Sequence, residues 1–184
     1  MLTSISPLGE QARGNRWAVT AAAYLAGSLL GGASLGALLG FVGPGPLPLA
    51  AAAACALAAA ADLAGLLPRG HRQVDEDWLT RYRGWVYGLG FGYQLGLGVV
   101  TIVTSASTYA VLALALCSGS PWVGAVIGGT FGLVRALPLL SLRRARTPAS
   151  LRGIGRRLDG LAAWAGRATA VLLAGAAAAL VATA

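Results

Sequence analysis

Five long apolar stretches dominate this chain and limit the folds that it can adopt. A helix needs about 18 to 25 apolar residues to cross the hydrocarbon core of a membrane. The stretches cover residues 17–42, 47–67, 85–117, 122–140 and 161–182. Because 57% of all residues are hydrophobic and only 11% are charged, polar surface is too scarce for a water-soluble fold. We therefore predict an all-α integral membrane protein, with residues 1–184 forming a single five-helix transmembrane bundle.

The arginines predict how this bundle is threaded through the membrane. Most of the fourteen basic residues, all of them arginine, precede the first stretch or lie in residues 68–84 and 141–160. The links at 43–46 and 118–121 carry no charge. Since basic residues stay on the cytoplasmic side of short loops, we expect a multi-pass protein of the plasma (inner) membrane, its N-terminus cytoplasmic and its C-terminus outside. The formal charge of +8 then indicates attraction to membrane lipids of the anionic inner leaflet, not to nucleic acid.

The third stretch is too long for one straight crossing and is unusually rich in glycine. Each glycine weakens a helix by about 0.8 to 1 kcal/mol relative to alanine. We expect a break, a kink or a close approach of another backbone, either at a transport site or through tight packing alone. The glycines concerned are Gly88, Gly90, Gly92, Gly96 and Gly98.

A second set of glycines predicts close helix packing. Gly27, Gly31, Gly36 and Gly40 follow one another at near-fourfold spacing, which places them on one face of the first helix. In lipid, small residues let backbones approach and hold helices together, within one chain or between protomers.

The first and second pairs of stretches also form a possible two-helix parallel repeat. Each pair opens with a glycine-rich helix and closes with Leu-Pro and arginines.

Two charged residues fall inside the apolar stretches. Asp62 and Arg135 each lie about two turns from the arginine-rich rim, so we consider them a candidate intramembrane ion pair or solute site. The alternative is a pair that only locks helices, or two side chains that snorkel independently. Polar residues that could line a path are Gln94, Thr101, Thr104, Ser105 and Thr108.

No catalytic constellation is visible in the sequence. The single histidine, His71, has no serine or cysteine near it, so we expect no catalytic residue, no cofactor and no metal site. His71 and Asp75, four residues apart, are an alternative metal-ligand pair beside the interpretation as a solvated loop. Cys55 and Cys117 are more typical of small apolar residues in packed helices than of a disulfide.

The segment Gly90-Phe91-Gly92-Tyr93-Gln94-Leu95-Gly96-Leu97-Gly98 resembles the glycine-rich opening of a membrane helix in the cytochrome c biogenesis and DsbD-like transmembrane family, and in related small-solute exporters. In the electron-carrying members a proline-cysteine pair follows, whereas Val99-Val100-Thr101 stands here. The resemblance implies a small helical bundle with a central path.

These observations favour a small transporter or transmembrane conduit that acts as an oligomer, and they argue against an enzyme. The alternative is a non-catalytic accessory or anchoring subunit of a larger membrane complex. A homo-oligomer and a hetero-complex both fit the glycine-rich surfaces.

Overall fold

The computed structural model describes residues 5–66, 78–98, 105–145 and 147–182, which contain helices and no strand. Their order is α1 (Pro7–Ala12), α2 (Trp17–Val42), α3 (Pro48–Ala64), α4 (Trp78–Arg81), α5 (Gly84–Leu97), α6 (Ser107–Leu116), α7 (Pro121–Ala136), the 3-10 helix η1 (Leu137–Arg144) and α8 (Pro148–Ala182). Three of the longer helices begin at a proline, whose fixed φ and missing N–H suit the first helical position.

Three helical segments are long and apolar enough to cross a membrane, which is typical of a membrane protein. Within the described residues they are Trp17–Val42, Pro121–Arg143 and Trp164–Ala182. The first is α2, the second is α7 continued by η1, and the third is the latter part of α8. The apolar helices α3 and α6 are shorter than this length.

The predicted five-helix bundle is therefore supported for three of its five stretches. The stretch over 85–117, in which we expect a break, a kink or a close backbone approach, contains two helices. Helix α5 ends at Leu97, where Gly98 takes a left-handed φ of 70°, and α6 begins at Ser107. The second stretch shortens to α3, which ends where Gly65 takes a φ of 64°. Glycine adopts this conformation without the steric cost that a side chain would add.

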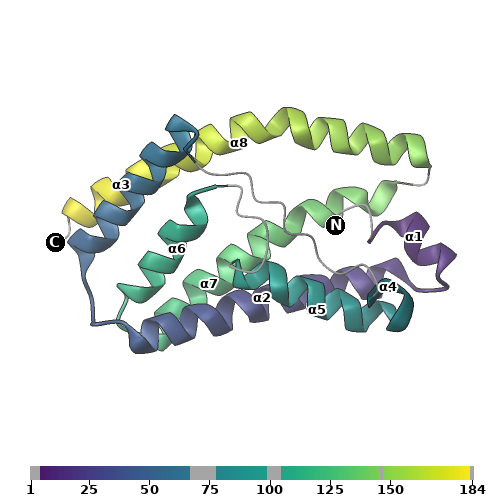
Figure 1. The fold of residues 1–184 in the computed structure, drawn as a ribbon, viewed down its shortest axis with the longest axis horizontal. Coiled ribbons are helices and arrows are strands. Elements are labelled where there is room, and N and C mark those ends of the chain that lie inside the picture. Colours follow the sequence, from purple (N-terminus) through teal and green to yellow (C-terminus); the bar gives the residue numbers. More distant parts are fainter. Residues whose placement is uncertain (1–4, 67–77, 99–104, 146, 183–184) are drawn as a thin grey trace.

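Helices α2, α5 and α7 lie side by side and form a glycine core (Figure 1). Gly92 and Gly96 of α5 approach Tyr24 and Ser28 of α2, so these two helices run parallel. Along α7 the order is reversed: Gly124 meets Gly36 and Gly132 meets Ser28. Helix α2 is thus held on two sides.

The helices α3, α6 and α8 form a separate alanine layer. Its buried residues are mostly alanines and come from all three helices, with Cys55 fully buried among them. In Figure 1, α3 and the latter part of α8 lie together at one end, and α6 lies between them and the glycine core. In the proposed repeat, α3 and α7 are the second helices of their pairs, and they pack differently. Helix α7 packs against α2, whereas α3 packs against α8.

The two uncharged links meet at one end of the molecule. The backbone N–H of Leu47 donates to the carbonyl of Cys117 at 3.1 Å, and Gly119 lies against Gly45. The starts of α2 and α5, which follow Arg16 and Arg83, lie at the other end (Figure 1). There a second cluster joins Tyr24, Tyr87 and Phe91 to Leu139 and Leu142.

Candidate functional site

The glycine core is closed by direct contact between backbones. A Cβ atom on Gly32 or Gly36 would overlap the carbonyl oxygen of Gly128 or Gly124, and the same holds in the reverse direction. Gly27 and Gly31 face the carbonyls of Leu89 and Tyr93 on α5 in the same way. The first-helix glycines predicted from their spacing thus serve packing within the chain, between α2 and two neighbours.

Ser28 lies at the centre of this core and is fully buried. Its hydroxyl donates to the carbonyl of Gly132 on α7 at 2.7 Å. Its own carbonyl faces Gly96 of α5 and Gly132 of α7. One serine therefore touches both partner helices, and its hydroxyl is satisfied in a region that water does not reach.

A buried carboxylate, which the sequence analysis did not single out, lies at the arginine-bearing end of the core. Glu10 of α1 has no exposed surface. Its oxygens accept hydrogen bonds from the hydroxyl of Thr20, at 2.8 Å, and from the hydroxyl of Tyr87. Arg13 completes the cluster with an ion pair of 2.6 Å, and Asn15 donates to the Tyr87 hydroxyl at 3.2 Å.

This Glu10 cluster joins three helices, because Thr20 belongs to α2 and Tyr87 to α5. Burial lowers the pKa of Arg13, but its hydrogen bonds to Glu10 and Tyr87 outweigh this effect and raise that pKa above its ordinary value. A buried carboxylate with three charged or hydroxyl donors is well satisfied. The arrangement fixes α1 against the core.

Asp62 binds the start of α6. One carboxylate oxygen accepts from the Ser105 hydroxyl and the other from the backbone N–H of Ala106, both at 2.6 Å. The Ser105 hydroxyl also contacts that of Ser107 at 2.8 Å. A carboxylate at this position satisfies an N–H that a helix start leaves without an intrahelical partner. Asp62 thus ties α3 to α6.

Arg135 has different partners. Its Nη1 donates to the carbonyl of Leu95 near the end of α5 at 3.2 Å, and its guanidinium lies 5.6 Å from the centre of the Phe131 ring. A cation at the C-terminal end of a helix is favoured by the partial negative charge there. The structure therefore places Asp62 in the alanine layer and Arg135 in the glycine core.

The other predicted path-lining residues do not form one continuous stripe among the described residues. Thr108 is buried, whereas Gln94 and Ser105 are half-buried and belong to different segments. Thr101, Thr104, His71 and Asp75 lie outside the described residues. Cys55 and Cys117 are both free thiols. Within the described ranges no group of three metal-ligating side chains comes together.

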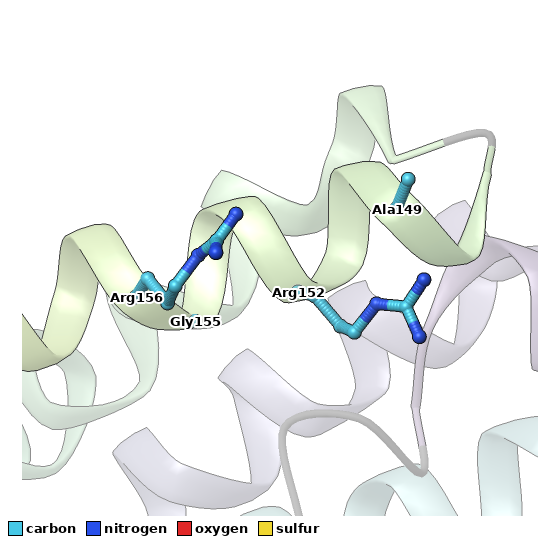
Figure 2. Close-up of a pocket in the computed structure, with 4 residues that line it drawn as sticks. All are labelled: Ala149, Arg152, Gly155 and Arg156. Carbon is cyan, nitrogen blue, oxygen red and sulfur yellow. The ribbon is translucent and has the colours of Figure 1, made fainter.

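A pocket of about 540 Å³ lies on the first part of α8. It is lined by Ala149, Arg152, Gly155 and Arg156 (Figure 2). Both arginine side chains extend back toward the start of α8, and both are exposed. Two guanidinium groups on one side of a helix form a surface for anions.

The chain is similar to two proteins named methylamine utilization protein MauF. It is 31% identical to the one from Methylobacillus flagellatus over 135 residues, and the match covers 67% of this chain and 48% of that protein. It is 30% identical to the one from Methylophilus methylotrophus over 151 residues, and the match covers 75% of this chain and 53% of that protein. The chain spans about half the length of these relatives. No family model and no solved structure matches it.

These relatives correct the resemblance drawn from residues 90–98. The chain is similar to MauF proteins and not to the cytochrome c biogenesis and DsbD-like family. The misleading signal was the glycine pattern of that segment. Gly92 and Gly96 recur at a spacing that packs α5 against α2, a need shared by many unrelated membrane helices.

Proposed function

We propose that this chain is a non-catalytic integral-membrane accessory protein that works in the utilization of methylamine or a related amine. Its similarity to the methylamine utilization proteins MauF supports the process. The glycine core supports the accessory role, because α2 touches α5 and α7 backbone to backbone and leaves no room for a solute between them. Such a core suits a rigid membrane platform for a partner protein.

The proposed platform crosses the membrane five times, with its arginine-bearing loops in the cytoplasm. The parallel run of α2 and α5 supports this threading, as does the meeting of the two uncharged links at the far end. It can be tested by placing single cysteines in a background without Cys55 and Cys117. Gly45→Cys should react with a membrane-impermeant maleimide in intact cells, and Gly153→Cys only after lysis. The reverse pattern would refute the threading.

Genetic complementation tests the accessory role. A strain that lacks this chain should grow poorly on methylamine, and the double variant Asp62→Ala, Arg135→Ala should restore growth. Gly36→Leu should not restore it, because the side chain would collide with α7. Gly166→Leu is the matched control, since the space beside Gly166 is open. Immunoblots of the membrane fraction show whether each variant is present. Rescue by Gly36→Leu, or equal failure of Gly166→Leu, would contradict the proposal.

A second candidate function, an oligomeric conduit for a small solute, is favoured by one observation. Asp62 and its two serine neighbours form a polar group beside the point where the expected third span is broken. Proteoliposomes that hold the purified chain test this idea with radiolabelled methylamine as the probe. A conduit should take up the probe, and Asp62→Asn should slow uptake severalfold. Uptake no faster than in empty liposomes would exclude this candidate for methylamine.

A further inference from the structure

We propose that Arg152 and Arg156 form a binding site for the phosphate of an anionic phospholipid headgroup. The two arginines line the same pocket at the start of α8, with Ala149 and Gly155 as its other lining residues. Those two residues are small, and both arginine side chains extend toward the start of α8 (Figure 2). Guanidinium groups bind phosphate oxygens through paired N–H donors.

The pocket lies on the side of α8 that faces away from the core. Leu151 and Ile154 pack against the cluster that includes Tyr87 and Leu139. At about 100° of rotation per residue, Arg152 and Arg156 lie on the opposite side of the helix from them. The first part of α8 is therefore amphipathic, with its apolar side on the core and its arginine side free for a ligand.

Charge and position favour a lipid over a free anion. Residues 143–159 contain six arginines and one aspartate, so this segment attracts an anionic membrane surface. The same helix continues without interruption into the candidate span Trp164–Ala182. A headgroup in the pocket would thus belong to a lipid whose chains lie beside that span. The site would hold the start of α8 at the membrane surface.

Native mass spectrometry of the full chain in detergent tests this site, with dioleoylphosphatidylglycerol and dioleoylphosphatidylcholine as probes. The unmodified chain should retain phosphatidylglycerol in preference to phosphatidylcholine. The double variant Arg152→Gln, Arg156→Gln should lose about 25-fold of that preference, since each direct hydrogen bond from an exposed guanidinium to the headgroup contributes about fivefold. Circular dichroism should be unchanged, because both side chains are exposed.

The control is the double variant Arg143→Gln, Arg157→Gln, which removes the same charge from exposed arginines that do not line the pocket. It should keep the preference within about threefold. An equal loss in both double variants would show attraction by net charge alone and would overturn the proposal. So would an unmodified chain without preference. Displacement of phosphatidylglycerol by 10 mM inorganic phosphate would assign the pocket to a free anion and would also overturn it.

Discussion

The glycine core and the alanine layer use small residues in two different ways. In the core, glycines of α2 face glycines of α7 and the backbone of Leu89 and Tyr93 on α5, and the backbones touch. In the layer, α3, α6 and α8 meet through alanine side chains around Cys55. The glycines of α8 contribute nothing to that contact, because the space beside each of them is open. Glycine content therefore says little about packing until the partner of each glycine is known.

The largest expected effect is that of Gly32→Ala in the core. The added methyl group would overlap the carbonyl of Gly128, and a backbone cannot move aside as a flexible side chain can. We expect a loss of about 3 kcal/mol in the free energy of unfolding. Unfolding in sodium dodecyl sulfate, followed by the fluorescence of the five tryptophans, measures it. A loss below about 0.5 kcal/mol would show that the backbones of the glycine core are not in close contact, so the core would not differ from the alanine layer.

Glu10→Ala should have the next largest effect and tests how the core is joined to α1. It leaves the hydroxyls of Thr20 and Tyr87 and the guanidinium of Arg13 without their shared acceptor. We expect a loss of about 2 kcal/mol in the free energy of unfolding. Breaking a fully buried ion pair would cost more, but Arg13 is partly exposed. Glu10→Gln should cost less, since an amide oxygen still accepts. The same fluorescence measurement applies, and equal stability of Glu10→Ala and the unmodified chain would contradict the cluster.

In the alanine layer, Asp62→Ala should lower the free energy of unfolding by about 1 kcal/mol, because the hydrogen bonds of Asp62 at the start of α6 are lost. Asp62→Asn retains an oxygen acceptor and should cost less than half as much. Hydrogen exchange at the N–H of Ala106 provides a local readout and should become faster in Asp62→Ala. Unchanged exchange would show that Asp62 does not cap this helix.

Gly175→Ala in α8 should have the smallest effect, with the opposite sign. Nothing lies where the new methyl group would go, and alanine favours a helix more than glycine. We expect a gain of up to about 1 kcal/mol in the free energy of unfolding. A clear destabilisation would mean that Gly175 packs against a neighbour, and the contrast with Gly32 would fail.

The sequence predicted the coarse features of this fold better than its contacts. Composition indicates a membrane protein, and three helices of sufficient length agree with it. Spacing placed Gly27, Gly31 and Gly36 on a packing face, since a helix has a fixed period. The glycines of the stretch over 85–117 predicted a break, a kink or a close backbone approach, but neither they nor hydropathy placed the end of α5 at Leu97.

The candidate site depended on pairings that local sequence does not encode. Glu10 meets Tyr87 across 77 positions, and no pattern near either residue marks the contact. The proline after Ser6 could have indicated a short helix with Glu10 and Arg13 one turn apart. Asp62 and Arg135 lie at similar distances from the arginine-rich rim, but depth does not determine which helices are neighbours. Asp62 binds Ser105 instead.

Disulfide trapping between α2 and α7 tests the glycine core most directly. A Cβ atom on Gly129 would lie 3.4 Å from that of Ala33, close to the separation found in disulfides. In a background without Cys55 and Cys117, Ala33→Cys with Gly129→Cys should form an intramolecular disulfide on mild oxidation, visible as faster migration in a denaturing gel. Ala33→Cys with Gly175→Cys should not. Absence of the first cross-link, or only cross-linked dimers, would contradict the interlocked core.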